Sequence, residues 1–446
     1  MTATLHAQGL TVSAIASGTR IDILRNIDLA LQPGRVLGLV GESGAGKSMI
    51  GRVIGRNLPS AFSVTSGSLT FQGRDLLSLG TRDRLALLGR QIAFIPQEPL
   101  TALNPTVTIG SQFGEHLARL GVSRNDRAAR IIAALGEVRL RDPQSLLDSY
   151  PFQLSGGMCQ RVLIAMAFAG RPALIIADEP TTALDVSTQA HIVQIMRGLQ
   201  RDTGTALLFI THDLKLASHV CDEIMVLYAG DVVERGPARR VTAAPRHPYT
   251  RALLAANPPL SGARHRLMAL PDQMPGLAAF ANLPGCRFAP RCAVRDPACA
   301  NTVPEMSEVD ADHFVRCSAG CLTGATAVEG AALRIADADA AGAPILTIDD
   351  VSKHYPGKRN WLGAPRPGVD AVRPVDLTVS AGEFVGIVGE SGSGKSTLAR
   401  LAMGLERPTS GRILIDGKDV TTDAPEARVI RLDALQMVFQ DPQSAL

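Results

Sequence analysis

Two nearly identical glycine-rich segments constrain this chain more than any other feature. The first, GLVGESGAGKS, spans residues 38–48, and the second, GIVGESGSGKS, spans residues 386–396. Each contains G-x-x-x-x-G-K-S directly after an apolar run, residues 36–40 or 384–388, that predicts a buried strand. A strand, a tight glycine turn and a helix make up a phosphate-binding loop.

In such a loop several backbone N–H groups point at phosphate oxygens, and the following helix presents its positive end to the same anion. Lys47 and Lys395 would reach the β- and γ-phosphates, and the hydroxyls of Ser48 and Ser396 would ligate Mg²⁺. A glycine turn without a ligand would explain one copy, but it explains two copies in the same setting poorly. The residues expected at the phosphates are Gly41, Glu42, Ser43, Gly44, Ala45, Gly46, Lys47, Ser48 and Met49, and Gly389, Glu390, Ser391, Gly392, Ser393, Gly394, Lys395, Ser396 and Thr397.

Length, charge and composition limit the classes of protein to which this chain can belong. The 446 residues suffice for two or three domains, and a net charge of +3 is too balanced to indicate a nucleic-acid partner. Although 46% of the residues are hydrophobic, no uninterrupted apolar run reaches membrane-spanning length. The N-terminus lacks the basic start and apolar core of a signal peptide. We therefore expect a soluble chain in the cytoplasm, where the seven cysteines are not expected to form disulfides.

The duplication extends beyond the two loops. SGSLTFQGRDL after the first loop is echoed by SGRILIDGKDV after the second, and AFIPQEPLTAL by MVFQDPQSAL. Between these halves lies a proline-rich region with clustered cysteines and then an Ala/Gly-rich run that is typical of a linker. The expected domains are a first nucleotide-binding domain at 1–236, an extension at 237–321, a linker at 322–343 and a second, incomplete nucleotide-binding domain at 344–446.

In the first half, β-like runs alternate with helical patterns, which predicts an α/β fold with a mostly parallel sheet covered on both faces. The expected strands are 36–40, 91–95, 174–177 and 206–210, and the expected helices are 48–55, 156–169 and 188–200.

An acidic pair follows one of these strands. The run ALIIADE ends in Asp178 and Glu179, at the sheet edge where α/β folds bind ligands. Asp178 would hold Mg²⁺, and Glu179 would be the general base that polarises the attacking water. Two solvated acids at a strand end would be the better explanation if the phosphate loop were absent.

Residues 154–161 read LSGGMCQR, and here the chain resembles the ATP-binding-cassette (ABC) ATPases, whose signature is LSGGQ or a near variant. Ser155 is a good N-cap, and Gly156 and Gly157 allow close backbone approach, so this helix start could face a γ-phosphate. An ordinary glycine-capped helix is the alternative. The resemblance implies a P-loop NTPase fold with a helical subdomain, here with a cysteine-containing extension and a partial second cassette.

Other marks of the family follow in the expected order. Gln97 matches the glutamine that links the metal and the water to the helical subdomain, Ala183 to Asp185 match the loop after the acidic pair, and His212 matches the histidine at the γ-phosphate. The resemblance thus implies Glu179, His212 and Gln97 as catalytic residues. The Mg²⁺ ligands that it implies are Ser48, Gln97, Asp178, Ser396 and Gln440.

The family often stacks an aromatic residue on adenine, upstream of the first loop. This sequence has only Ala14 and Ile15 there, whereas Tyr355 is the matching candidate in the second half. We therefore expect phosphate binding at both loops, and adenine stacking at the second.

Three features resemble one branch, the ATPases of bacterial oligopeptide, dipeptide and nickel importers. They are EPLTALNPTVTIGSQ at 98–112, the signature form SGGM, and RHPYTRALL at 246–254. The cysteines belong to the same comparison, at Cys286, Cys292, Cys299 and Cys317, with Cys321 just beyond. Four thiolates suit Zn²⁺ or an iron–sulfur cluster, and the absence of tight C-x₂-C pairs favours [4Fe–4S], which the branch carries at matching cysteines. Four reduced cysteines without metal remain the alternative, while Cys159 and Cys221, in helical patterns, are expected in the core.

In this family two nucleotide-binding domains close head to tail around two ATP molecules, so the resemblance implies a second such domain, in cis or in trans. It also implies two membrane permease subunits, an extracytoplasmic substrate-binding protein, and a peripheral position on the cytoplasmic face of the bacterial inner membrane. The second half lacks a signature, an acidic pair and a switch histidine, so we expect neither composite site to be complete within one chain. A truncated or incompletely recorded tandem ATPase would explain this, as would pairing of first halves from two chains.

The expected function is ATP hydrolysis coupled to uptake of peptides or related small solutes. A soluble ABC ATPase acting on ribosomes or DNA is an alternative hypothesis, which the modest net charge and the EPLTALNP and HPYT segments disfavour. A nucleotide-binding regulator without turnover is a third. The sequence does not identify the cargo.

Overall fold

The computed structural model describes residues 3–16, 19–182, 184–257, 270, 272–318, 342–357 and 368–439. The chain divides into two compact units. The first comprises Met1–Leu184 and Thr188–Leu333, and the second Arg334–Leu446 together with Asp185–Ser187.

The central sheet of the first unit has eight strands in the order β11-β12-β10-β9-β3-β8-β7-β6. Its parallel part runs from β9 to β6, and β3 hydrogen-bonds to both β8 and β9. The buried parallel strands are almost wholly apolar, because both of their faces are covered. The strands are β3 (Val36–Val40), β6 (Ile92–Ile95), β7 (Leu174–Asp178), β8 (Ala206–Thr211), β9 (Glu223–Tyr228), β10 (Asp231–Pro237), β11 (Met306–Asp310) and β12 (His313–Arg316).

A second, antiparallel sheet has the order β2-β1-β4-β5. Its apolar residues share a core with α1 and the central sheet. This sheet was not among the expected elements. Its strands are β1 (Leu5–Ala16), β2 (Thr19–Leu31), β4 (Phe62–Phe71) and β5 (Arg74–Asp75).

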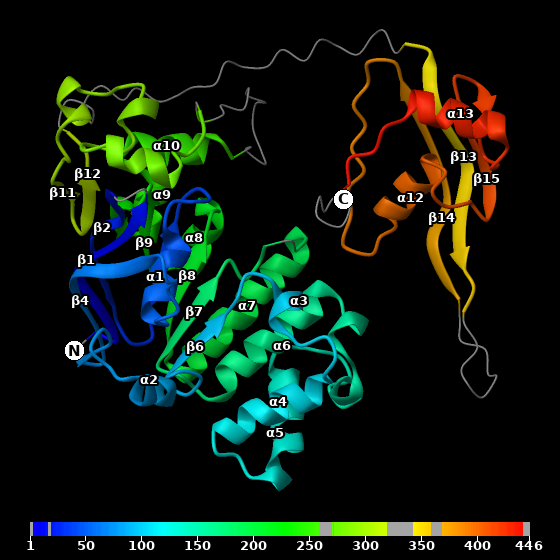
Figure 1. The fold of residues 1–446 in the computed structure, drawn as a ribbon. Coiled ribbons are helices and arrows are strands. Elements are labelled where there is room, and N and C mark those ends of the chain that lie inside the picture. The colour runs from blue at the N-terminus through cyan, green and yellow to red at the C-terminus, as the bar shows by residue number, and fades with distance from the viewer. Residues whose placement is uncertain are drawn as a thin grey trace. The chain divides into compact units, whose positions relative to one another are not determined.

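The helices of the first unit fall into groups. Helix α1 (Lys47–Ile54) follows β3, and α4 (Ile109–Arg119) and α5 (Arg124–Glu137) pack with α6 (Gly156–Ala169) as a helical subdomain (Figure 1). The other α-helices are α2 (Thr81–Leu87), α3 (Pro99–Ala102), α7 (Val186–Thr203), α8 (Leu214–Val220), α9 (Ala238–Ala243) and α10 (Pro248–Ala255). Short 3₁₀ helices are η1 (Ser145–Asp148), η2 (Pro151–Gln153), η3 (Leu277–Asn282), η4 (Ala289–Arg291) and η5 (Pro297–Ala300).

The extension begins at α9 and returns to the central sheet. Its hairpin β11–β12 joins the edge of that sheet, where β12 pairs antiparallel with β10. This hairpin thus extends the first unit's own sheet, and η3 contacts β2.

The second unit has one antiparallel sheet, ordered β14-β13-β15-β16. A small apolar core joins this sheet to α12 and α13. Its elements are β13 (Pro344–Tyr355), β14 (Val369–Ser380), α12 (Lys395–Ala402), β15 (Ser410–Ile415), β16 (Lys418–Asp419) and α13 (Pro425–Ala434).

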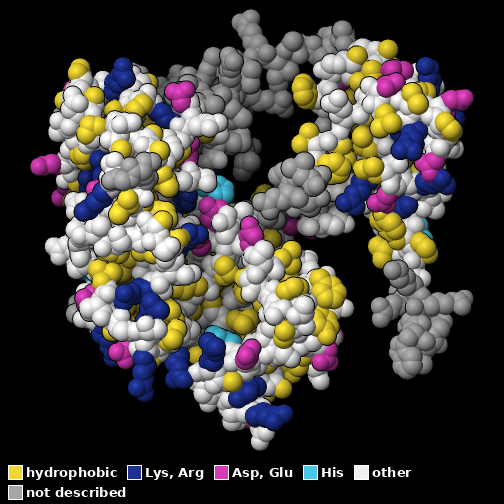
Figure 2. All heavy atoms as spheres, in the orientation of Figure 1, with side chains coloured by type: hydrophobic (Ala, Val, Ile, Leu, Met, Phe, Trp, Pro, Cys, Tyr) yellow, Lys and Arg dark blue, Asp and Glu magenta, His cyan; other side chains and the backbone are white. Residues whose placement is uncertain are grey.

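Most of the expected elements of the first unit are confirmed, with ends shifted by at most a few residues. The expected strand at 384–388 is wrong: this segment forms no strand, and Phe384 and Val388 are almost fully exposed. In the first unit β3 lies between β8 and β9, whereas no described strand of the second unit runs beside residues 384–388. Hydrophobic side chains are accordingly visible on the surface of the second unit (Figure 2).

The expected core cysteines are buried. Cys159 lies within α6, but Cys221 follows α8 as its C-cap residue rather than lying in a helix. Within the described ranges, no helix has the length and hydropathy needed to cross a bilayer.

Candidate nucleotide-binding site

The first phosphate loop, residues 41–48, connects β3 to α1. Gly44 and Gly46 adopt left-handed φ values of 83° and 102°, and a Cβ on Gly46 would stand 2.7 Å from a side-chain carbon of Leu24. Only glycine fits there without strain. The Nζ of Lys47 donates to the carbonyl oxygens of Gly41 at 2.8 Å and Glu42 at 2.9 Å. The lysine therefore folds back across its own loop, as a phosphate-binding lysine must.

Lys47 is almost fully buried. Burial lowers the pKa of its ammonium group, while the negative charges of Glu179, Asp178 and Glu42 oppose that change. Its Nζ lies 3.9 Å from Oε1 of Glu179. The loop thus holds one buried cation beside the acidic pair, where a polyphosphate would find a fixed positive charge.

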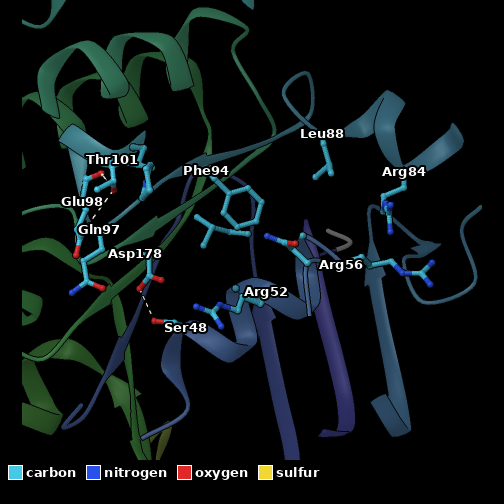
Figure 3. Close-up of a pocket in the computed structure, with 16 residues that line it drawn as sticks. Ser48, Arg52, Arg56, Arg84, Leu88, Phe94, Gln97, Glu98, Thr101 and Asp178 are labelled. Atoms are coloured by element: carbon cyan, nitrogen blue, oxygen red, sulfur yellow. Dashed lines mark hydrogen bonds between the residues drawn. The ribbon is translucent and has the colours of Figure 1, made fainter. Parts of the chain in front are cut away.

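The acidic pair stands at the end of β7, as expected. Ser48 Oγ donates to Asp178 Oδ1 at 2.9 Å, as Figure 3 shows. Burial raises the pKa of the Asp178 carboxyl, and the hydrogen bond from Ser48 counters this only in part. Two oxygen donors thus meet beside the loop, a donor set that suits a hard cation such as Mg²⁺.

Glu179 is the point where the motifs meet. Its Oε2 accepts from Thr182 Oγ1 at 2.9 Å and from Gln97 Nε2 at 3.3 Å, and it lies 3.2 Å from His212 Nδ1. Its backbone has a left-handed φ of 45°, a conformation that non-glycine residues seldom adopt and that often marks functional sites.

Glu179 and His212 shift each other's titration. The hydrogen bond from His212 lowers the pKa of Glu179, and the same bond raises the pKa of His212. Glu179 is 14% exposed and His212 is 60% exposed, so the histidine lies on the solvent side of the pair. A carboxylate held ionised beside a lysine and a glutamine can accept a proton from water.

The signature residues form a separate group. Ser155 caps α6, its Oγ accepting from Met158 N at 3.3 Å, and a Cβ on Gly157 would stand 2.9 Å from Thr188 Cγ2. Among the described residues, no hydrogen bond or ion pair joins Ser155, Gly156 or Gly157 to residues 41–48. Asp185 accepts from Ser187 Oγ at 2.7 Å, and Ala183 lies outside the described residues.

The second loop, residues 389–396, repeats the lysine arrangement. Lys395 Nζ donates to the carbonyl oxygens of Gly389 at 2.7 Å and Glu390 at 2.6 Å, and Gly394 has a φ of 95°. Tyr355 hydrogen-bonds Glu406, and the ammonium of Lys353 lies 5.1 Å from its ring centroid. Gln440 and Cys321 lie outside the described residues.

A cavity of about 610 Å³ opens next to the first loop. Ser48, Asp178 and Gln97 lie at one end and Arg84 at the other (Figure 3). Arg52 and Arg56 from the α1 region also line it. The cavity therefore extends from the oxygen donors beside the loop to α2.

The four cysteines of the extension lie near one another without forming a ligand set. Cys286 and Cys317 pack against buried Cys299, and burial raises the pKa of Cys286 to about 11. Nowhere in the described part of the chain do three or more His, Cys, Asp or Glu side chains group so that they could hold a metal ion. The predicted cluster is therefore unsupported by this geometry.

Sequence reasoning missed three contributors. Thr182 holds Glu179, while Tyr249 and Arg291 of the extension both contact Glu42. Thr182 follows the acidic pair and could have been suspected. No pattern marked Arg291, which lies 249 residues from its partner.

Comparison with known proteins decides the family. A family model described as "ABC transporter" matches residues 24–182 and 372–445, and one described as "Oligopeptide/dipeptide transporter, C-terminal region" matches residues 233–299. The chain belongs to the ABC transporter family. The resemblance and the P-loop α/β fold class expected from the motifs are thereby confirmed, and the chain is an ABC-type ATPase.

Two relatives of this ABC transporter chain illustrate the match. The oligopeptide transport ATP-binding protein OppD of Mycobacterium tuberculosis is 36% identical over 100% of this chain and 74% of its own length. The glutathione import ATP-binding protein GsiA of Escherichia coli O157:H7 is 34% identical over 99% of this chain and 64% of its own length. A dimeric ATP-binding cassette solved in a post-hydrolysis state with ADP and phosphate is 27% identical, with a TM-score of 0.47 over 53% of this chain and 99% of its own.

Proposed function

We propose that this chain hydrolyses ATP to drive uptake of peptides or related small solutes through membrane permeases. The convergence of Lys47, Gln97 and His212 on Glu179 carries the proposal of hydrolysis. The match to an oligopeptide/dipeptide transporter region, and the names of the relatives OppD and GsiA, support the kind of cargo. Dipeptides, longer peptides, nickel complexes and glutathione all remain candidates.

In the proposed mechanism, residues 41–48 bind the phosphates and Lys47 pairs with the β- and γ-phosphates. Glu179 accepts the proton of the attacking water, with His212 and Gln97 holding its carboxylate in place. Ser48, Asp178 and Gln97 would hold Mg²⁺, which supplies charge neutralisation at the phosphates when bound. Exposed His212 would meet the γ-phosphate.

We propose the domain limits 1–236, 237–321, 322–343 and 344–446, with a second nucleotide at residues 389–397 and Tyr355 stacked on its adenine. Gln440 and Ser396 would serve the second Mg²⁺. Complete catalysis requires a second complete cassette, in cis or in trans, because each ATP also needs a signature such as Ser155 to Gly157 from the facing domain, together with Asp185. ATP binding would favour the closed pair and hydrolysis would release it.

The proposed partners are two transmembrane permease subunits and an extracytoplasmic substrate-binding protein, at the cytoplasmic face of the inner membrane. The cavity beside Gln97 supports this, because Thr101 of α3 also lines it, α3 packs on α6 of the helical subdomain, and a permease helix could contact this surface.

The finer proposal of a [4Fe–4S] cluster at Cys286, Cys292, Cys299 and Cys317 rests on the soft donor set and the family resemblance. Reduced thiols without metal are the alternative. Iron and acid-labile sulfide assays on anaerobically purified protein decide between them: both present supports the cluster, and both empty removes it.

Reconstitution tests the function. The chain would be co-expressed with a pair of permease subunits from an oligopeptide importer and placed in proteoliposomes with the substrate-binding protein of that importer. We expect ATP hydrolysis that rises when the binding protein carries a peptide, and no hydrolysis in a Lys47→Ala variant. Recovery of the chain with ribosomes or DNA instead of permeases would overturn the proposal.

A further inference from the structure

Two residues of the extension contact Glu42, the second residue of the first phosphate loop, one at its backbone and one at its side chain. The backbone N–H of Glu42 donates to the phenol oxygen of Tyr249 at 2.8 Å. The carboxylate of Glu42 accepts from Arg291, Nη1 at 2.8 Å and Nη2 at 3.2 Å. Both partners are buried, with Tyr249 0% and Arg291 6% exposed. We call this set of contacts the Glu42 clamp.

Arg291 is held rigidly in the clamp. Its guanidinium also donates to the carbonyl of Asp272 at 3.1 Å and to the hydroxyl of Tyr228 at 3.4 Å. The ring of Tyr228 packs edge-on against Tyr249 and Phe288, with centroids 4.8 and 5.0 Å away. A bidentate arginine–carboxylate contact whose arginine is held in this way fixes the orientation of the carboxylate and also neutralises its charge.

Tyr249 is positioned by the segment RHPYT. Buried Glu234 accepts from the backbone N–H groups of Arg246 at 2.7 Å and His247 at 2.9 Å, which anchors the start of α10. Burial lowers the pKa of His247 to about 4, so its imidazole is neutral at pH 7. Its Nδ1 can then accept from the N–H of Tyr249 at 3.1 Å.

The clamp matters electrostatically. Glu42 lies in the loop that receives the phosphates, and its carboxylate is close enough to act on Lys47. An uncompensated carboxylate there would repel a polyphosphate and compete for the lysine. Arg291 neutralises this charge in a buried, weakly screened position.

The second loop provides an internal comparison. Its sequence GESGSGKS places Glu390 where the first loop has Glu42, and Lys395 makes the same contacts to backbone carbonyls. Glu390 is exposed, and in the described part of the second unit no arginine or tyrosine holds it. The clamp is therefore a contribution of the extension and not of the loop sequence.

We propose that Arg291 and Tyr249 are positioning residues of the first nucleotide site, through which the extension sets its affinity for MgATP by way of Glu42. This concerns nucleotide binding by the first unit and does not depend on the cargo. The extension thereby has a role at the ATP site in addition to any role of its cysteines.

Titration of the full chain with a fluorescent ATP analogue and Mg²⁺ tests the proposal. Arg291→Ala leaves Glu42 charged without a counter-charge, so we expect Kd to rise about tenfold, within the range typical of coupled sites. In the double variant Arg291→Ala/Glu42→Gln the repelling charge is gone, and we expect Kd to return to within about threefold of the wild type. In the assembled transporter, Arg291→Ala should raise KM for ATP and leave kcat little changed, because Arg291 contacts no reacting atom.

Arg240→Ala is the matched control. This exposed arginine of the same extension pairs with Asp310 at 3.2 Å and donates to the carbonyl of Ala311, so its removal should leave Kd unchanged. Tyr249→Phe keeps the buried ring and removes only the acceptor for Glu42 N–H; it should raise Kd even if Arg291→Ala does not fold. Two results would overturn the proposal. The first is an unchanged Kd for MgATP in Tyr249→Phe together with an unchanged Kd in Arg291→Ala or, if that variant does not fold, in Arg291→Lys. The second is a double variant that binds MgATP as weakly as Arg291→Ala. Lys47→Ala is the reference variant for loss of MgATP binding. If only this variant loses MgATP binding, the result contradicts the clamp but still supports the nucleotide site.

Discussion

Nδ1 of His212 lies 3.2 Å from Oε2 of Glu179, although the two residues follow different strands. The strands β7 and β8 are parallel neighbours, with Asp178 paired to Ile210, so the residues after their carboxyl ends meet at one edge of the sheet. Thr182 and Gln97 approach the same oxygen. One carboxylate oxygen therefore joins three separate segments of the chain.

The His212–Glu179 pair should make stability depend on pH. The raised pKa of His212 contributes stability that is complete below the ordinary histidine value and is lost as pH rises through the raised pKa. The lowered pKa of Glu179 contributes stability that is present above the ordinary carboxyl value and is lost as pH falls through the lowered pKa. The pair is thus strongest near pH 5–6.5, between the ordinary values of about 4.3 and 6.5.

A double-mutant cycle of His212→Ala and Glu179→Ala, followed by urea unfolding, measures this pair. Because His212 is well exposed, we expect a coupling free energy of only about 0.5 kcal/mol at pH 6, falling towards zero at pH 9. The exposed Arg240–Asp310 ion pair, which contains no histidine, is the control. Equal coupling of His212 and Glu179 at both pH values would contradict the assignment.

The Ser48–Asp178 contact predicts a change in metal requirement. Ser48→Ala removes one proposed Mg²⁺ ligand and the donor that orients Asp178. We expect the Mg²⁺ concentration for half-maximal ATP hydrolysis to rise at least about tenfold, the usual effect of losing a group that orients a metal ligand. Ser78→Ala, which removes a local hydrogen bond to Asp75 on the exposed surface, should have no such effect. An unchanged Mg²⁺ dependence in Ser48→Ala would argue against Ser48 as a ligand.

Glu234 should be a major contributor to the stability of the first unit. Its fully buried carboxylate accepts from Arg246 N and His247 N and contacts His313 Nε2 at 2.7 Å. Glu234→Ala leaves these donors buried without an acceptor, and we expect the free energy of unfolding to fall by about 3–5 kcal/mol in denaturant titrations. Glu308→Ala, on the exposed face of β11, should cost less than about 1 kcal/mol. A loss of that small size for Glu234→Ala would show that these donors find other acceptors.

The parallel strands of the first unit could be predicted because a strand buried on both faces reads as a continuous apolar run, as in β7 and β8. The same pattern gave a wrong strand prediction at residues 384–388. An apolar run shows that a strand can be buried, but not that neighbouring strands are present to supply its hydrogen bonds. The antiparallel sheet β2-β1-β4-β5 was missed because its strands carry polar residues on one face and bend at bulges.

The site shows the same division. Lys47 and Glu179 stand in short local motifs whose chemistry suggested their roles, whereas the role of His212 was implied by the family resemblance. The Glu42 clamp joins residues 207 and 249 positions apart, and no local periodicity records which buried arginine will reach which carboxylate. Such pairs follow from the tertiary fold, here from the return of the extension to the edge of the central sheet.

The central claim is that Glu179 is the base for ATP hydrolysis. Its most direct test is the steady-state ATPase rate of Glu179→Gln in the assembled transporter, measured beside MgATP affinity. Glutamine keeps the size of the side chain but cannot accept the proton, so we predict at least about a hundredfold loss of turnover with MgATP affinity retained. Turnover close to that of the wild type, in a variant that still binds MgATP, would contradict the account.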